Sequence, residues 1–342
     1  MLNGRMGNRH HTVFSAPDRS YLAIVKKEIH SFALQLEFNA KKQAELDIIV
    51  AEIASNLVKH AGGGEILVRK LEEPAYAGIE LISIDNGPGM SDPGRMVADG
   101  TSTTNTLGQG LGAIKRLSDK FELYSLKNWG TILLARVYTK KPPVPATLPK
   151  VEIRPVVVPK PGESECGDGY ATKITANGLK LFLGDGLGHG PEASHAVEEA
   201  IKTFQLSPET RPTDLLRSMH QAVRKTRGLV GTILQFDFKS RRWTVCGIGN
   251  IATRFQGTLF SKSHMAYNGI IGMNIPGTMS DQEVGFENGQ LVIMCSDGIK
   301  SRWDLSKYPA IVNYDLSILA AALYKDYSRR TDDTSVVVAR IG

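Results

Sequence analysis

The sequence predicts an α+β protein built from two domains, and three observations support this prediction. Apolar residues recur at helical spacing over residues 46–61, and strand-like apolar runs follow them. Residues 140–149 contain four prolines in ten positions, which excludes a helix or an inner strand and favours a semi-extended linker. Strand-like segments dominate the sequence beyond this linker. We therefore expect a first domain over residues 1–139, a linker over 140–150 and a second domain over 151–342.

The composition limits the class of protein. A length of 342 residues suits two domains, and 42% hydrophobic residues are enough for two cores. No apolar run reaches about 18 residues, so we expect no membrane span, and the N-terminus lacks the apolar region of a signal peptide. Three scattered cysteines form no ligand pair, which fits a reducing cytoplasm. The net charge of +6 has no accompanying stripe of Lys and Arg among aromatics, so nucleic-acid binding is unsupported and an acidic protein partner explains the charge equally well.

The pattern of the first domain indicates helices packed on one face of a sheet. A short strand precedes a helix over about residues 19–36, with Asp18 as its candidate N-cap. A second helix over residues 40–61 ends at three consecutive glycines. The remaining elements are strands over 65–71 and 78–84, a helix over 111–119, and strands over 121–125 and 131–138.

A glycine-rich stretch follows the strand that ends before Asp85. This carboxylate opens the string DNGPG, where an acceptor stands beside glycine backbone that a flat ring can approach. Gly108, Gly110 and Gly112 lead into a helical pattern, and bare backbone amides at a positive helix end suit phosphate. Residues 91–107 are too polar for a core and too long for an ordinary connection, so we expect a mobile lid.

Glu52 and Asn56 lie upstream, four residues apart on the expected helix over 40–61, so they stack along one edge of its apolar face. In this order, the strings EIASN, DNGPG and GQGLG resemble the three sequence boxes of the GHKL (Bergerat) ATPase fold, an α/β sandwich, over about residues 12–139. The resemblance is nearest to the small bacterial serine kinases of partner-switching systems, with the RsbT type first and the RsbW and SpoIIAB anti-sigma type second.

This resemblance implies an ATP site with a bound Mg²⁺. Asp85 would accept a hydrogen bond from the adenine amino group, with Gly87 and Gly89 beside the base. Asn56 would hold Mg²⁺ through its amide oxygen, and Glu52 would take the proton of an incoming serine hydroxyl. The phosphates would lie against three glycines, Gly108, Gly110 and Gly112.

The second domain is rich in strands with helices between them. Strand-like segments occupy residues 151–158, 232–238, 243–247, 251–255 and 291–294, and helical patterns occupy about 191–204, 212–227 and 315–328. Its informative feature is a set of carboxylates, most of which lie at strand ends next to glycine, where the chain can turn a carboxylate into an open site. The set comprises Asp168, Asp185, Asp297 and the adjacent Asp332 and Asp333.

Four carboxylates brought together repel one another unless hard cations neutralise them, and oxygen ligands select Mg²⁺ or Mn²⁺ over Zn²⁺. Two such ions about 4 Å apart can hold a bridging hydroxide and a phosphate for in-line hydrolysis. No Cys or Ser stands in a nucleophile setting, which argues against a phospho-enzyme route.

The strings ECGD, GDGLGHG, GIGN, CSDG and RTDDTS follow the order of the metal-dependent serine/threonine phosphatases, the PPM family. They resemble its SpoIIE/RsbU/RsbX branch over about residues 151–342, with the short RsbX form nearest. The resemblance implies a PPM-type β-sandwich flanked by helices. It assigns the metal ligands to Asp168, Asp185, the Gly186 carbonyl, Asp297 and Asp332, with Asp333 left open as the alternative to Asp332.

Together, the two resemblances imply a cytoplasmic, bifunctional partner-switching regulator. The first domain would phosphorylate, with ATP and Mg²⁺, a Ser or Thr of a STAS-domain anti-sigma-factor antagonist. The second would remove that phosphate with Mg²⁺ or Mn²⁺, and the short linker would raise the effective concentration of both domains on one substrate. Two alternatives stay open: the first domain grips a sigma factor or STAS partner without phosphate transfer, or it gates a phosphatase-only enzyme by nucleotide. A homodimer also stays open.

Overall fold

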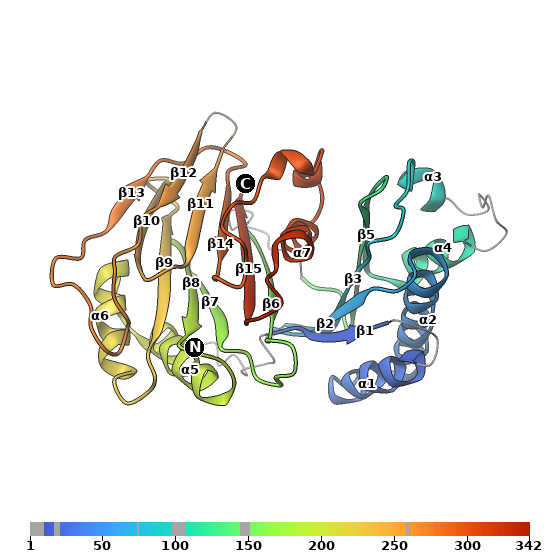
Figure 1. Cartoon of the computed structure of the whole chain (residues 1–342), viewed down its shortest axis with the longest axis horizontal. Coiled ribbons are helices and arrows are strands. Elements are labelled where there is room, and N and C mark those ends of the chain that lie inside the picture. Colours follow the sequence, from blue (N-terminus) through green and yellow to red (C-terminus); the bar gives the residue numbers. More distant parts are fainter. Residues whose placement is uncertain (1–9, 17–20, 74, 98–106, 144–150, 258–259) are drawn as a thin grey trace. The chain divides into compact units, whose positions relative to one another are not determined.

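The computed structural model describes residues 10–16, 21–73, 75–97, 107–143, 151–257 and 260–342 (Figure 1). The predicted mixture of helices and sheets is confirmed. Contacts divide the chain into unit 1, Met1–Val144 with Tyr308–Ala322, and unit 2, Pro145–Lys307 with Leu323–Gly342. Residues Tyr308–Ala322 are therefore distant from the rest of unit 1 in sequence, although they pack with it.

Several predictions made from the sequence concern residues that the structure does not describe. Asp18, the candidate N-cap, lies outside the described residues, as do residues 98–106 of the expected lid and 144–150 of the expected linker. The described start of the expected lid contains a short helix, α3 (Pro93–Val97).

Unit 1 is built on a five-stranded antiparallel sheet in the order β1-β2-β3-β5-β4. The strands are β1 (Thr12–Ser15), β2 (Glu65–Glu73), β3 (Tyr76–Ile84), β4 (Lys120–Leu126) and β5 (Gly130–Tyr138). Strand β3 is buried from Gly78 to its end, and Asp85 follows directly. The sheet therefore delivers this carboxylate at the end of an inner strand.

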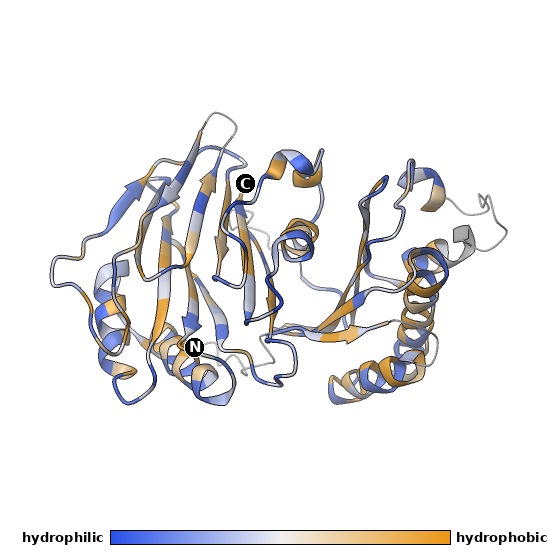
Figure 2. Cartoon of the chain, viewed as in Figure 1, coloured by the Kyte–Doolittle hydropathy of each residue, from blue (hydrophilic) through white to orange (hydrophobic). Residues whose placement is uncertain are grey.

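Helices cover one face of this sheet, as predicted. They are α1 (Leu22–Gln35), α2 (Ala40–Asn56) and α4 (Leu107–Leu117). Their apolar residues form one core with alternate residues of the strands, such as Ile79 and Leu81 of β3. Figure 2 shows the mixture of hydrophobic and hydrophilic residues along α1 and α2 that an amphipathic helix carries. Asn39 caps α2, because its side-chain oxygen accepts from the Lys42 N–H at 2.9 Å.

The α-helix ends at Asn56 instead of running regularly to residue 61. A π-helical turn, η2 (Leu57–Ala61), continues it, and Gly62 ends this turn in the left-handed region with φ of 71°. A π turn holds more residues than an α turn, so the side chains after Asn56 are rotated away from the expected helical positions. Periodicity in the sequence does not reveal such a local change.

Residues Tyr308–Ala322 contact β4 and the turn that follows it within unit 1. The Tyr124 hydroxyl donates to the Pro309 carbonyl oxygen at 3.2 Å, and its ring lies edge-on to Tyr314 with centroids 5.2 Å apart. The Trp129 ring also lies edge-on to the Tyr308 ring, with their centroids 5.7 Å apart. Helix α7 (Leu316–Tyr327) begins in this segment and continues into unit 2.

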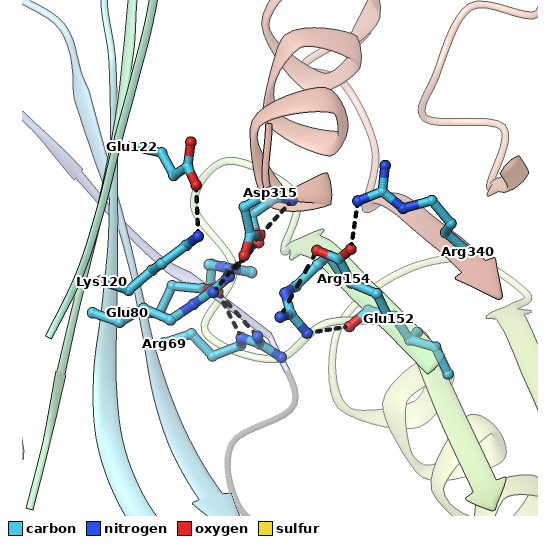
Figure 3. A network of polar contacts seen from close by, with 12 residues as sticks. Arg69, Glu80, Lys120, Glu122, Glu152, Arg154, Asp315 and Arg340 are labelled. Atoms are coloured by element: carbon cyan, nitrogen blue, oxygen red, sulfur yellow. Dashed lines mark hydrogen bonds and ion pairs between the residues drawn. The ribbon is translucent and has the colours of Figure 1, made fainter. Parts of the chain in front are cut away.

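A buried ion network lies on β3 and its neighbours in unit 1, and Figure 3 shows Arg69, Glu80 and Asp315 in it. Arg136 Nε donates to Glu80 Oε2 at 2.6 Å, and Arg69 Nη2 donates to Glu80 Oε1 at 3.0 Å. Burial acts to raise the pKa of the fully buried Glu80, but the charges of Arg69 and Arg136 outweigh it and hold that pKa well below its usual value. Glu80 therefore stays ionised inside the unit.

Unit 2 contains two five-stranded antiparallel sheets. The first has the order β13-β10-β9-β8-β7, with β13 (Gln282–Val284), β10 (Arg242–Ile248), β9 (Leu229–Asp237), β8 (Gly178–Gly186) and β7 (Asp168–Ile174). The second has the order β12-β11-β14-β15-β6, with β12 (Ser261–His264), β11 (Ala252–Gln256), β14 (Leu291–Cys295), β15 (Thr334–Ile341) and β6 (Val151–Val158). Leu181 and Leu234 of the first sheet share a core with Phe255 and Val337 of the second, so the expected β-sandwich is confirmed.

Two helices, α5 (Pro191–Leu206) and α6 (Pro212–Ala222), cover the outer side of the first sheet. Phe204 of α5 and Leu216 of α6 share a second core with Phe182 and Ile233. Two short 3₁₀ turns, η3 (Leu305–Lys307) and η4 (Ile311–Asn313), precede α7. Within the described ranges, no helix is long and apolar enough to cross a bilayer.

Candidate functional sites

Unit 1 contains a pocket beside the end of β3 and the start of α4. Its empty volume is about 740 Å³, which includes space open to solvent. Its wall is mainly apolar, with Ile53, Leu111 and Leu133 among its members, and a few polar side chains interrupt it. These polar residues are Asn56, His60, Ser83, Asp85 and Thr131. An apolar cleft with a few converging polar groups is typical of a site for a small organic ligand.

Asp85 is fixed at the edge of this pocket. Its Oδ1 accepts from the Gly87 N–H at 2.8 Å and from the Thr131 N–H at 3.1 Å. Gly89 has φ of 66°, and a Cβ there would overlap the Leu126 carbonyl oxygen, so the turn after Asp85 requires glycine. The DNGPG string thus holds a carboxylate against closely approaching backbone, as expected.

Glu52, Asn56 and Gly110 lie together. A Cβ on Gly110 would stand 2.6 Å from Glu52 Oε2 and 3.6 Å from Asn56 Oδ1, so glycine lets α4 approach both side chains. Asn56 Nδ2 is buried and has no hydrogen-bond partner among the described residues. Such an atom fits a site whose polar ligand completes the hydrogen bonding. These residues therefore fit ATP with its Mg²⁺. The Asn56 amide would hold the Mg²⁺, and the backbone N–H groups at the start of α4 would face the phosphates.

The position of the three glycines differs from expectation. We expected the helix to start at residue 111, whereas α4 begins at Leu107, so Gly108, Gly110 and Gly112 all lie inside it. The first N–H groups of a helix have no partner within the helix, so the amides near Gly108 and Gly110 still suit an anion.

Three polar residues of the pocket were absent from the site predicted from the sequence: His60, Ser83 and Thr131. His60 reaches the wall from the π turn, and burial, with a smaller contribution from Lys59, lowers its pKa. Ser83 and Thr131 are at the ends of adjacent strands, β3 and β5, whose register pairs residue 83 with Leu133. The sequence indicated Ser83 and Thr131 as pocket residues only by placing a polar residue near the end of each inner strand.

In unit 2, the expected carboxylates gather at one end of the β-sandwich. Asp168 begins β7 and Asp185 lies near the end of β8, and the strand register places the two directly opposite each other. Burial, followed by the charges of Asp168, Asp297, Asp332 and Asp333, raises the pKa of Asp185. Burial also raises the pKa of Asp168. The charges of the other four carboxylates therefore all bear on Asp185.

The residues of this cluster fit a divalent cation. Asp168 is 5% exposed, and its Oδ1 has no hydrogen-bond partner in the described chain, while its Oδ2 accepts from Ser296 Oγ at 2.6 Å. Within the described residues, no three His, Cys, Asp or Glu side chains already surround a common point as metal ligands would. The register nevertheless places Asp168 opposite Asp185, and a cation bound there would offset the repulsion from the neighbouring carboxylates that raises the pKa of Asp185.

Asp332 and Asp333 have different surroundings. Asp333 is 3% exposed, and its two oxygens accept from the Lys160 N–H at 2.8 Å and the Gly167 N–H at 3.0 Å. Asp332 is more exposed, and its Oδ1 accepts from the Asp333 N–H at 2.9 Å. The oxygens of Asp333 thus fasten the chain before β7, which favours Asp332 as the ligand.

Two family models match the chain. The histidine kinase-like ATPase domain matches residues 14–137, and the stage II sporulation protein E (SpoIIE) family matches residues 175–342. Both matched ranges agree with the resemblances that the sequence motifs indicate.

Two curated proteins of Bacillus subtilis (strain 168) are similar to the chain. "Serine/threonine-protein kinase RsbT" is 36% identical over 103 residues, which is 30% of this chain and 77% of RsbT. "Phosphoserine phosphatase RsbX" is 30% identical over 95 residues, which is 27% of this chain and 46% of RsbX. The chain thus spans most of RsbT but less than half of the length of RsbX.

A solved structure described as "The bacterial stressosome: a modular system that has been adapted to control secondary messenger signaling" is also similar. It shares 30% sequence identity with a TM-score of 0.53, over 56% of this chain and 100% of that chain. Through its N-terminal part the chain belongs to the RsbT family of histidine kinase-like ATPase domains, and residues 175–342 of the same polypeptide match the SpoIIE family model.

Proposed function

We propose that this chain is a bifunctional, cytoplasmic partner-switching regulator. Its N-terminal domain phosphorylates, and its C-terminal domain dephosphorylates, a Ser or Thr of a STAS-domain anti-sigma-factor antagonist. The observation that carries the proposal is that a chain matching both the histidine kinase-like ATPase model and the SpoIIE model contains a pocket with Asp85 at its edge and a carboxylate cluster around Asp185.

The phosphatase site consists of the carboxylate cluster of unit 2. Bound Mn²⁺ or Mg²⁺ would lower the pKa of water and supply hydroxide at neutral pH. The proposed ligands are Asp168, Asp185, the Gly186 carbonyl, Asp297 and Asp332. Ser296 orients Asp168 by donating to its Oδ2. Attack of hydroxide on phosphorus breaks the bond to the serine oxygen, which takes up a proton, so the products are serine and inorganic phosphate.

The kinase site consists of the pocket of unit 1. Asp85 would accept from the adenine amino group, and Asn56 would hold the Mg²⁺ of ATP. The approach of Gly110 to Glu52 supports a carboxylate beside the phosphates. In the transfer step, the serine oxygen bonds to the γ-phosphorus, its proton passes to Glu52, and the bond to the β-phosphate oxygen breaks to release ADP.

The relatives support one shared class of substrate. RsbT is described as a serine/threonine kinase and RsbX as a phosphoserine phosphatase, so one adds and the other removes phosphate on a side-chain hydroxyl. Fusing the two domains keeps both activities at a high effective concentration near one bound protein. A STAS-domain protein is the partner that the resemblance to partner-switching kinases and phosphatases implies.

A second candidate function is a phosphatase gated by nucleotide, and helix α7 favours it. The helix begins in unit 1 next to Asp315, which pairs with Arg136. It ends in unit 2, where the Tyr327 carbonyl accepts from the Lys300 N–H at 2.9 Å, three residues after Asp297. The same helix thus carries residues of both units, and a dependence of the phosphatase rate on ATP would support gating.

The test follows the phosphorylation of one small STAS-domain protein by mass spectrometry, with ATP, Mg²⁺ and Mn²⁺ present. Glu52→Ala is expected to bind ATP almost normally and to dephosphorylate the substrate without phosphorylating it, whereas Asp185→Asn accumulates phosphoprotein. Phosphorylation by Glu52→Ala at the parent rate would refute the assignment of the base. In the same variant, a phosphatase rate that changes with ATP indicates gating, and an unchanged rate indicates independent domains.

A further inference from the structure

Asn250 contacts the carboxylate of Asp297 directly. Its Nδ2 donates to Asp297 Oδ2 at 2.9 Å, from the loop that joins β10 and β11. The preceding Gly249 has φ of 94°, and a Cβ there would overlap the Val230 side chain. The Gly249 N–H also donates to the Tyr267 carbonyl oxygen at 2.8 Å. The loop is therefore held in a conformation that only glycine adopts easily, and this conformation aims Asn250 at Asp297.

The main chain of the Asp297 turn is held from another direction. Arg329 Nε donates to the Asp297 carbonyl oxygen at 2.8 Å, and the Arg329 N–H donates to the Gly298 carbonyl oxygen at 2.8 Å. These bonds use main-chain oxygens of the turn and do not occupy the carboxylate of Asp297, which accepts from Asn250. The adjacent Arg330 is engaged elsewhere, since its guanidinium lies over the Tyr324 ring, 4.4 Å from its centroid.

We infer that Asn250 is a positioning residue for Asp297, and that Arg329 fixes the turn that carries it. The inference rests on the proposed function, because Asp297 is a proposed metal ligand. The hydrogen bond to Oδ2 restricts rotation of the carboxylate and leaves Oδ1 for a cation. An amide suits this role, because it donates without the positive charge that a Lys or Arg would place beside the metal.

The test measures Mn²⁺ binding by electron paramagnetic resonance of the free ion, together with the hydrolysis of p-nitrophenyl phosphate. Asn250→Ala is expected to weaken Mn²⁺ binding about 10-fold, the size of effect that loss of an outer-shell partner causes. Saturating Mn²⁺ should restore kcat, and the unfolding temperature of the metal-free protein should not change. Asn250→Leu, of similar size and without a donor, should behave in the same way. Arg329→Ala should weaken Mn²⁺ binding by a smaller factor.

Two matched controls are available. Asn288 is an exposed asparagine at the opposite end of β14, where its Oδ1 accepts from Arg241 Nη2, so Asn288→Ala should bind Mn²⁺ as the parent does. Arg330→Ala should do the same. Parent-like Mn²⁺ affinity in both Asn250 variants would overturn the inference, as would a loss of kcat that saturating Mn²⁺ does not restore. Failure of the parent itself to bind Mn²⁺ would instead refute the proposed metal site.

Discussion

Arg136 and Asp315 form a two-pronged buried ion pair within unit 1. Arg136 Nη1 lies 2.7 Å from Asp315 Oδ2, and its Nη2 lies 2.9 Å from Asp315 Oδ1. The two residues are 4% and 6% exposed. Burial acts to lower the pKa of Arg136, but the neighbouring Glu80 and Asp315 outweigh it and raise that pKa. The pair thus joins a strand of the ATPase sheet to a segment 179 positions later in the sequence.

Asp315→Ala is expected to destabilise the protein by about 2–4 kcal/mol, because it leaves a buried guanidinium with Glu80 as its remaining carboxylate partner. Urea unfolding measures this change. Glu122→Ala is the control in the same unit, since the Lys120–Glu122 pair is partly exposed and should contribute at most about 1 kcal/mol. Equal effects of the two substitutions would contradict a structural role for the buried pair.

Asp85→Asn is expected to weaken ATP binding about 10- to 100-fold, because the adenine amino group loses a charged acceptor. The amide oxygen can still accept from the Gly87 and Thr131 N–H groups, so the loop should keep its shape. Isothermal titration calorimetry with ATP and Mg²⁺ measures the affinity, and thermal unfolding without nucleotide serves as the control. An unchanged Kd for ATP would mean that Asp85 does not contact the adenine ring.

Asp332 and Asp333 are expected to fail in different ways when replaced. Asp332→Asn should lower Mn²⁺ affinity and leave the unfolding temperature unchanged. Asp333→Ala should destabilise the protein by about 2–4 kcal/mol, because the N–H groups of Lys160 and Gly167 lose their buried acceptor. Parallel measurements of Mn²⁺ binding and urea unfolding distinguish them. The reverse pattern would make Asp333 the ligand.

The carboxylate cluster should make the metal-free protein less stable as pH rises. The pKa of Asp168 is raised, mainly by burial, to about 7, so the native state binds more protons than the unfolded state above about pH 4. Its stabilising contribution is complete below the unfolded pKa and is lost as pH rises through the folded pKa. The unfolding temperature in EDTA should fall over this window, and Mn²⁺ should restore it near pH 8. A flat or rising profile would mean that the pKa of Asp168 is not raised in the folded protein.

The sequence motifs located both candidate sites, but not every contact that shapes them. Asp85 and Asp185 could be found because a carboxylate next to glycine at the end of an apolar strand is a local pattern. The π turn after Asn56 could not be predicted, because the helical spacing of apolar residues does not reveal one irregular turn. The packing of Tyr308–Ala322 with unit 1 depends on partners such as Arg136 that are remote in sequence. The hydrogen-bond partners of Asp333, which favour Asp332 as the proposed ligand, are likewise remote in sequence.

We propose that the cluster around Asp185 binds the metal on which the C-terminal phosphatase activity depends. Asp185→Asn removes one negative charge at nearly constant volume, so the fold should survive while metal affinity falls. The most direct measurement is hydrolysis of p-nitrophenyl phosphate by parent and variant across a Mn²⁺ titration, with an EDTA arm. We expect a loss of two or more orders of magnitude in the variant, partial rescue by excess Mn²⁺, and no activity of the parent in EDTA. Full activity of Asp185→Asn in EDTA would contradict the metal-dependent mechanism.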